Sequence, residues 1–271
     1  MSHHSDGKHT SRIAVLFRAY TKLGVGLLSF TIILFIWEIA TRIGGWNPAI
    51  FPGPIRVIEG VLELADSGVL WKHITASLFR VTIGFYLAVI FGVPTGILLG
   101  RIPMMHNMLN PIVQFLRPIS PLAWIPIAML LYGIGDKPAI FLIFLASFFP
   151  LVVATYVSVS SINEIYFRVA SNFGFSRWEV LSKVVVPAIT PDVITALRLT
   201  VAIAWLVVVA AEMIAVQSGL GYLILDSRNA LRMDYVMAGM MVIGAIGLLL
   251  DVGMQKLDSG AANGWKRATS N

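Results

Sequence analysis

The sequence contains no cysteine, which excludes disulfide bonds, thiolate metal sites and cysteine nucleophiles. Charge is scarce as well, because Asp, Glu, Lys and Arg make up only 13% of the 271 residues, whereas a typical soluble domain carries about 25%. Hydrophobic residues account for 57% of the chain, and the mean hydropathy is +0.82. A chain of this length has room for about six membrane helices of about 20 residues each. The composition therefore predicts an all-α membrane protein.

Two functional signatures are also missing. The sequence has no GxxxxGK[ST] phosphate loop, so the chain is not predicted to hydrolyse ATP itself. The formal charge is +6, but no basic stripe is interleaved with aromatic residues, which argues against nucleic-acid binding. The N-terminal histidines, His3, His4 and His9, have no fixed spacing, which favours a mobile tail over a metal site. His73 and His106 stand alone, which argues against a membrane-embedded enzyme.

Six hydrophobic runs are long enough to cross a membrane. They are Leu23–Ile43, Val81–Gly100, Leu109–Ile134, Pro138–Asn163, Pro191–Val216 and Tyr235–Leu257. No small-x-small cleavage site follows the first run, so we interpret it as an uncleaved helix. An even number of spans places both termini on one side, and the excess of Lys and Arg in the corresponding loops predicts that this side is cytoplasmic. Residues 1–22 are then a cytoplasmic tail, and residues 23–271 form a single transmembrane domain.

The loop over residues 44–72 is predicted to lie outside, in the periplasm. Pro54 suits the first position of a helix. An apolar stripe then follows at helical spacing, made of Ile55, Ile58, Val61, Leu62 and Ala65. The segment is predicted to be an amphipathic helix on the outer surface. Packing at the membrane interface is the favoured interpretation, and a docking ledge for an external partner is the alternative.

The second long loop, residues 161–190, is predicted to be cytoplasmic and to form two short helices. Gly174 can adopt a positive φ and end the first helix. Ser176 and Glu179 have the spacing of a capping box that begins the second helix, which is expected to end before Pro187. The result is a helical hairpin with an exposed tip. Small Ala170 and Gly174 would let another protein approach this tip closely.

The same loop resembles the cytoplasmic signature of the permease subunits of ATP-binding-cassette importers. That signature is Glu-Ala-Ala, three residues, Gly, nine residues, then Ile-x-Leu-Pro. This chain has Ala170, Gly174 and Pro187 at the family spacing, but Arg168 and Val169 replace the first two residues. The resemblance implies that the loop couples the chain to an ATPase. The residues implied in coupling are Arg168, Val169, Ala170, Gly174, Phe175, Ser176 and Pro187.

Other segments resemble the nitrate, sulfonate, taurine and bicarbonate branch of these importers. They are FPGP at 51–54, SLFRVTIGF at 77–85, PISPLAWIP at 118–126, YGIG at 132–135, the Leu197-Arg198 pair, AAEMIA at 210–215 and GLGYLI at 219–224. The resemblance implies a type I, MetI-like permease with six transmembrane helices in the bacterial inner membrane. It implies no cofactor in this chain, since ATP and Mg would be used by a cytoplasmic ATPase. It also implies an external binding protein, and either a second copy of the chain or a different permease as partner.

Several polar or kinked positions within the spans are candidates for the translocation path. Prolines in the third run bend the helix, which is tolerated where the backbone faces protein or a cavity. The candidate path residues are Ser120, Pro121, Trp124, Pro126, Trp205 and Glu212; ordinary kinked packing is an equal alternative. An ionisable residue in a span is a site hypothesis by default. For Glu212 a structural or gating role is favoured over direct contact with an anionic substrate.

Gly92, Gly96 and Gly100 recur at four-residue spacing in the second run. Small residues at this spacing allow two membrane helices to approach closely, so they are predicted to pack against another helix. The alternative function, a secondary transporter driven by an ion gradient, predicts inverted repeats with paired broken helices, and no such repeat is evident. The predicted function is therefore import of a small oxyanion, with nitrate, bicarbonate, and sulfonate or taurine left open.

Overall fold

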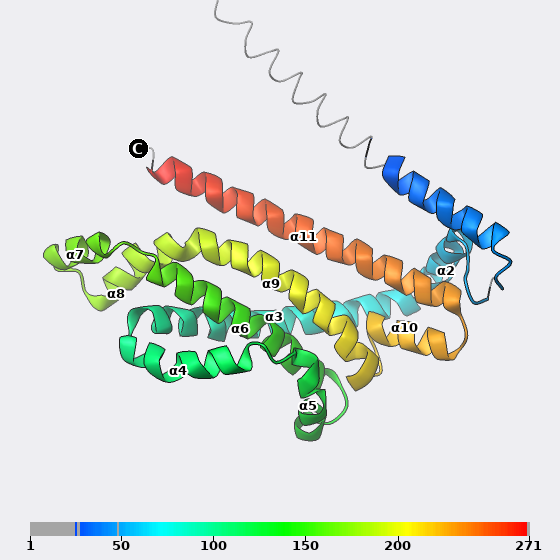
Figure 1. Cartoon of the computed structure of the whole chain (residues 1–271), viewed down its shortest axis with the longest axis horizontal. Coiled ribbons are helices and arrows are strands. Elements are labelled where there is room, and N and C mark those ends of the chain that lie inside the picture. Colours follow the sequence, from blue (N-terminus) through cyan, green and yellow to red (C-terminus); the bar gives the residue numbers. More distant parts are fainter. Residues whose placement is uncertain (1–24, 26–27, 48, 270–271) are drawn as a thin grey trace, which may run out of the picture.

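The computed structural model describes residues 25, 28–47 and 49–269, with side chains to Lys256. These residues form helices and no strands, as predicted. The predicted tail, residues 1–22 with its three histidines, lies outside the described part. Four long helices run roughly alongside one another (Figure 1). They are α3 (Val69–Arg101), α6 (Asp136–Ser160), α9 (Val186–Ala215) and α11 (Met233–Thr269).

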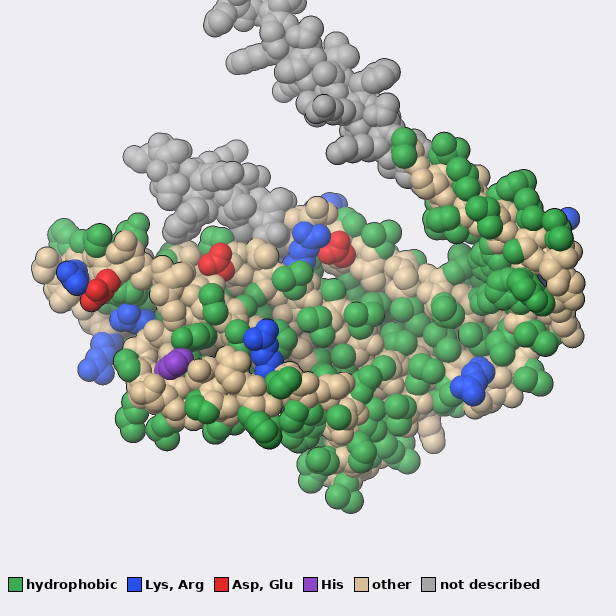
Figure 2. Space-filling model, in the orientation of Figure 1, with side chains coloured by type: hydrophobic (Ala, Val, Ile, Leu, Met, Phe, Trp, Pro, Cys, Tyr) green, Lys and Arg blue, Asp and Glu red, His purple; other side chains and the backbone are tan. Residues whose placement is uncertain are grey.

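Shorter elements connect the long helices or cover their ends. They are a helix over residues 28–43, α2 (Pro54–Asp66), α4 (Pro103–Leu116), the 3-10 turn η1 (Pro121–Trp124), α5 (Ile125–Tyr132), α7 (Glu164–Asn172), α8 (Arg177–Val180), the π-helical segment η2 (Leu181–Val185) and α10 (Leu220–Asn229). Elements α7 and α8 lie at one end of the bundle, and α2 and α10 lie at the other (Figure 1). Hydrophobic side chains cover much of the visible face of the bundle, whereas charged side chains are few and scattered (Figure 2). This surface suits a lipid environment.

A row of glycines joins α3 to α6. A Cβ atom on Gly96 would lie 2.5 Å from Cβ of Thr155, and one on Gly100 would lie 2.5 Å from Cγ1 of Val159. Gly92 faces Leu151 of α6 in the same way, at 3.3 Å. The three glycines that the sequence singled out therefore lie in the α3–α6 contact, where hydrogen in place of a side chain allows the two backbones to approach closely.

The third hydrophobic run is broken rather than simply kinked. Helix α4 begins at Pro103, earlier than the predicted Leu109, and the following η1–α5 segment is bent from it by 91°. Pro118 and Pro121 lie at the break. Proline removes a backbone donor and disfavours helical geometry in the residue before it, so two prolines three residues apart end the helix. The expected continuous span Leu109–Ile134 is thus a pair of shorter helices.

The chain has four helices long and apolar enough to span a membrane, or five spans when the bent pair is counted as one, among the residues that the structure describes. The first predicted span is helical over residues 28–43, and its beginning lies outside the described residues. Helix α3 begins at Val69, well before the predicted start at Val81. This correction places Arg80 in the interior of a helix rather than at the edge of a span.

The predicted end of the hairpin's second helix at Pro187 is wrong. Helix α8, the π-helical segment Leu181–Val185 and α9 form one continuous 39-residue helix, Arg177–Ala215. Pro187 lies in the first turn of α9, directly after the π-helical segment. Proline has no backbone N–H, so it cannot make the hydrogen bond that a regular helix needs at its position. The π-helical turn just before Pro187 shifts the hydrogen-bond register, and the helix therefore continues through Pro187 without a break.

Helix α2 has two apolar faces instead of the single stripe predicted. Val57, Gly60 and Leu64 are buried, and Gly60 lies directly against Tyr235 of α11. The predicted stripe is largely uncovered, since Ile55, Ile58 and Leu62 are exposed, while Val61 and Ala65 pack at the edge of the buried cluster. The sequence pattern could not separate these faces because both sit at helical spacing. One face attaches α2 to the bundle, and the other faces away from it.

Candidate functional site

The hairpin α7–α8 is built from local capping interactions. The Asn163 side chain accepts a hydrogen bond from the backbone N–H of Ile165 and caps α7. Gly174 then turns the chain with φ +70°, a conformation that side chains rarely adopt. Ser176 and Glu179 form the expected capping box, in which each side chain accepts a backbone N–H bond from the other residue. Local contacts within the hairpin therefore fix the geometry of the turn.

Several large apolar side chains of the hairpin are uncovered. Trp178 is 79% exposed and Phe173 is 76% exposed, and Ile165 and Tyr166 are also exposed. Ala170 faces the other way, because it is only 3% exposed. Its side chain is therefore covered by this chain and does not offer a partner a close approach, contrary to the expectation for this residue. Gly174 has open space around it. Exposed aromatic side chains of this kind make the hairpin a candidate interaction surface.

The other signature residues lie around this turn. Arg168 is exposed and pairs with Glu164 at 3.0 Å, and Val169 is exposed beside it. Phe175 is half-buried and packs near Phe173, with their ring centroids 6.4 Å apart. The pairing of Arg168 within α7 means that the substitution of the signature's acidic residue changes the surface charge of the hairpin without disturbing its fold.

A buried charged network lies toward the opposite end of the bundle. Glu212 of α9 has no exposed surface, and its Oε1 lies 2.6 Å from Nη1 of Arg80, whose side chain is 2% exposed. The Arg80 guanidinium also contacts Asp136, the first residue of α6, at 2.7 Å, and donates to the carbonyl of Ser218 at 2.8 Å. Breaking such a pair by removing one partner leaves an uncompensated buried charge. The network thus ties α3, α6 and α9 together.

The same network caps the beginning of α10. The backbone N–H groups of Gly219, Leu220 and Gly221 donate to His73 Nδ1, Ser77 Oγ and Glu212 Oε2, at 2.9, 2.9 and 3.0 Å. These are the donors that a helix start leaves without intrahelical partners. A carboxylate at this position also interacts favourably with the helix dipole. Gly219 has φ +103°, and its missing side chain leaves the space that the Glu212 carboxylate fills.

The six candidate path residues are not brought together. Trp205 is buried and donates from Nε1 to the carbonyl of Ile243 at 3.1 Å, so it joins α9 to α11. Trp124 packs instead near Ala211 and Ala215 of α9, in a separate cluster. Ser120 and Pro121 lie at the break between α4 and α5, and Pro126 lies in the first turn of α5; Ser120 and Pro126 are exposed. Glu212 belongs to the network above. The structure therefore separates these residues into four different surroundings.

The most important residue that sequence reasoning missed is Arg80. The charge-free run begins at Val81, which places Arg80 at the edge of a span. The usable signal was the combination of one arginine at Arg80 and one glutamate at Glu212 within hydrophobic surroundings, since buried ionisable groups are rarely left without a partner. Ser77 and Asp136 carry no such signal, because both residue types are common near helix ends.

These features define a class of protein. The chain is a multi-pass helical membrane protein with a charged network buried near one end and an apolar hairpin exposed at the other. No group of three or more His, Asp or Glu residues suited to a metal is present among the described residues.

The chain belongs to the family described as the binding-protein-dependent transport system inner membrane component, which matches residues 92–262. It is 35% identical over 240 residues to the taurine transport system permease protein TauC of Escherichia coli, covering 87% of this chain and 86% of TauC. It is 35% identical over 234 residues to the nitrate import permease protein NrtB of Leptolyngbya laminosa, covering 83% and 82% of the two chains. The chain is therefore an ABC importer permease of the inner membrane.

A solved structure shows the same fold. The inward-facing MetNI methionine ABC transporter superimposes with a TM-score of 0.63 at 16% identity, over 73% of this chain and 98% of that chain. The predicted type I, MetI-like fold is thereby confirmed. At this identity the similarity concerns the fold alone.

Proposed function

We propose that this chain forms the membrane path of an ATP-driven importer for a small oxyanion, and that the hairpin α7–α8 receives the movement of a cytoplasmic ATPase. The observation that carries the proposal is the exposure of large apolar side chains on the hairpin, above all Trp178 and Phe173. An isolated aromatic surface of this kind is costly in water, and aromatic residues are enriched where proteins bind one another. The hairpin end of the bundle is then cytoplasmic, as are both termini.

The continuous helix Arg177–Ala215 supplies the mechanical link. It begins at the hairpin turn and reaches Glu212 near the opposite end of the bundle without a hinge of loop structure. A displacement of Trp178 by a moving partner is therefore transmitted along one rigid element. Because Glu212 holds Arg80 and the start of α10, the movement acts on the contacts that join four helices. The network serves as the structural gate in this proposal.

The substrate class follows from two considerations. The named relatives concern taurine, which carries a sulfonate, and nitrate, so both names point to small oxyanions. The charge of Glu212 is compensated by Arg80 and so does not repel an anion that passes nearby. An external binding protein delivers the anion, a second permease copy completes the path, and the ATPase subunits use ATP and Mg.

The coupling role is tested at Gly174. Replacing Gly174 by Val strains the turn, because φ is +70° there and a left-handed conformation costs a side chain roughly 1–2 kcal/mol. The matched control is Gly68→Val, since Gly68 has φ +75°, has the same open surroundings and lies at the other end of the bundle. We expect Gly174→Val to weaken retention of the ATPase by about fivefold to thirtyfold and to lower ATP-dependent uptake, while Gly68→Val does neither.

Equal ATPase retention and uptake in the two glycine variants would remove the hairpin from the coupling mechanism. The substrate class is tested separately, in proteoliposomes that hold the chain with its ATPase and binding protein. ATP-dependent uptake of labelled nitrate, bicarbonate and taurine is compared with uptake of choline, a cation of similar size to taurine. Accumulation of choline in preference to all three anions would contradict the oxyanion proposal and leave the coupling proposal intact.

A further inference from the structure

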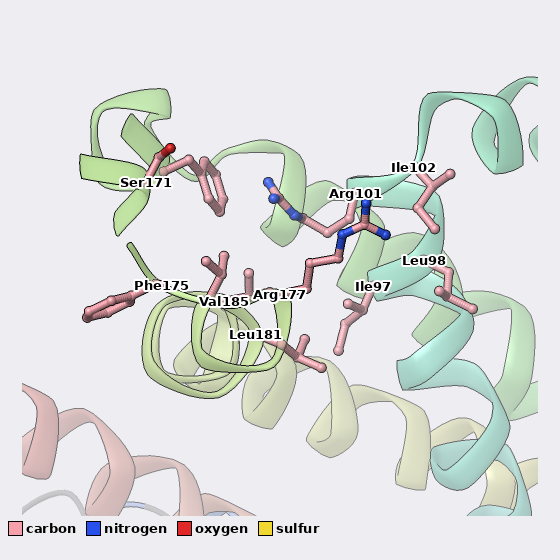
Figure 3. A pocket seen from close by; sticks show the side chains of 11 residues that line it. Ile97, Leu98, Arg101, Ile102, Ser171, Phe175, Arg177, Leu181 and Val185 are labelled. Carbon is pink, nitrogen blue, oxygen red and sulfur yellow. The ribbon is translucent and has the colours of Figure 1, made fainter. Parts of the chain in front are cut away.

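A cleft of about 550 Å³ lies between the end of α3 and the hairpin. Ile97, Leu98 and Arg101 line one side, and Ser171, Arg177 and Leu181 line the other (Figure 3). The two arginines come from elements far apart in the sequence, and both guanidinium groups lie in the space between these elements (Figure 3). The cleft is therefore a mixed site with two cationic groups and an apolar wall.

Arg101 and Arg177 differ in their pairing from the arginines that hold the fold together. Arg80, Arg198 and Arg232 each pair with a carboxylate of another residue. Among the described residues, no carboxylate lies within ion-pair distance of Arg101 or Arg177. Arg101 is nevertheless positioned, because its guanidinium carbon lies 3.9 Å from the ring centroid of Phe167. Stacking on an aromatic ring leaves the edge of the guanidinium and its N–H donors available for an anion.

The position of the cleft identifies the kind of anion. Arg101 is the last residue of the apolar helix α3, and the neighbouring α6 ends at Ser160. The cleft thus lies at the level where the hydrophobic spans end, which is the headgroup region of a membrane. Ile97 and Leu98 lie one turn deeper on α3, so the apolar wall continues toward the hydrocarbon. A ligand with a phosphate at the level of the arginines and an acyl chain below it fits both parts.

We infer that this cleft binds the phosphate headgroup of an anionic phospholipid on the side of the membrane that carries the hairpin. Arginine is suited to phosphate because its planar fork can donate two parallel hydrogen bonds. Basic pockets between membrane helices are also known as headgroup sites. A free phosphate would satisfy the arginines but would leave the apolar wall uncovered, which favours the lipid. The bound lipid would bridge α3 and the base of the hairpin, so it would steady the hairpin relative to the bundle.

Lipid retention is the direct test and needs neither transport nor the ATPase. The purified chain is placed in nanodiscs that mix phosphatidylglycerol and phosphatidylcholine, then extracted, and the lipid that stays bound is measured by native mass spectrometry. We expect preferential retention of phosphatidylglycerol. Replacing both Arg101 and Arg177 by Gln should lower that preference by about tenfold or more, since each cation near the membrane surface attracts anionic lipid. Arg168→Gln is the matched control, because Arg168 lies on the same hairpin and pairs with Glu164.

Two further measurements separate a bound lipid from a free anion and from a protein contact. Replacing both arginines by Lys retains the charge and should restore most of the preference, and rising salt should weaken it in the unmodified chain; both results hold even if the Gln variant folds poorly. Unchanged phosphatidylglycerol retention in the Gln variant would overturn the inference. Displacement of the lipid by inorganic phosphate would assign the site to the free anion. Selective loss of the ATPase with unchanged lipid retention would assign the arginines to a protein contact instead.

Discussion

Glu212 and Trp178 lie near opposite ends of one continuous helix, and their surroundings are opposite as well. Glu212 has no exposed surface and is bonded to Arg80, Ser77 and the backbone of Gly221. Trp178 is 79% exposed. The chain therefore satisfies a buried carboxylate internally and leaves the indole of Trp178 uncovered. The polar groups at one end of the helix are satisfied within this chain, and the proposed coupling role assigns a partner to the other end.

The difference has a clear energetic basis. A buried carboxylate without a partner would cost several kcal/mol, so the internal network has to be satisfied before the chain can fold. An exposed tryptophan costs much less and can be tolerated until a partner covers it. Changes at the two ends are therefore expected to act on different properties, with stability affected at Glu212 and association at Trp178.

The largest effect is expected from Arg80→Met. This change leaves Glu212 buried without its cation and removes the bond to Asp136, and we expect a loss of about 3–5 kcal/mol of stability. The measurement is thermal unfolding of the purified chain in detergent. The double variant Arg80→Met with Glu212→Gln removes both charges and should recover part of the loss. If the double variant loses more stability than the two single variants lose together, the pair is not the source of the stability.

The sequence predicted the elements that depend on local pattern. The hairpin turn at Gly174 and the capping box at Ser176 followed from residue types at fixed spacing, and the structure has both. The glycines Gly96 and Gly100 lie at the α3–α6 contact for the same reason, because their spacing places them on one face of a helix.

The remaining features depend on contacts between distant residues. Arg80 and Glu212 are separated by 132 positions, and nothing in either segment indicates the other. The inward orientation of Ala170 depends on how the hairpin rests on the bundle. The continuity of the helix through Pro187 depends on a π-helical turn, whose local sequence has no distinctive signal. Pairing, orientation and helix register therefore had to come from the structure.

The next largest effect on stability is expected at the α3–α6 contact, which lies between the hairpin end and the Glu212 end of the bundle. A Cβ atom on Gly96 would lie 2.5 Å from Cβ and 2.7 Å from a backbone oxygen of α6, so Gly96→Ala forces the helices apart. We expect a loss of about 1–3 kcal/mol, typical of overpacking. The control is Gly244→Ala in α11, where no atom lies within 4 Å and the change should be neutral or slightly stabilising. Equal unfolding temperatures of the two variants would contradict this account of the contact.

A smaller effect on stability is expected at the exposed end. Trp178→Ala should change the unfolding free energy by less than about 0.5 kcal/mol, as is usual for surface positions. Its effect on binding should be larger, because an aromatic anchor in an interface contributes about 2 kcal/mol or more. Trp71→Ala, at an exposed tryptophan of α3 near the other end of the bundle, is the control. A loss of ATPase retention in both variants, or in neither, would break the contrast between the two ends.

The smallest effect on stability is expected for the solvent-exposed polar contacts at the Glu212 end of the bundle. Glu63 of α2 accepts a hydrogen bond from the Tyr235 hydroxyl at 2.7 Å and contacts Arg232 and Arg56, and these groups lower the pKa of the Glu63 carboxyl. A lowered pKa in the folded state contributes stability that is fully present above the ordinary value and is lost as the pH falls through the lowered one.

Glu63→Gln should therefore reduce stability slightly at neutral pH, and the difference from the unmodified chain should shrink as the pH falls below the ordinary range of a glutamate, about 4.3. Thermal unfolding at a series of pH values measures this difference. Glu59→Gln, on the same helix and in contact with Arg56, controls for a general change of charge. A stability difference that grows as the pH falls would show that folding does not lower the pKa of Glu63, contrary to this prediction. Glu63 makes as many polar contacts as Glu212 but remains exposed to solvent, so its contacts should contribute much less to stability. A loss of stability as large as that from Arg80→Met would show that burial does not account for the difference between the two carboxylates.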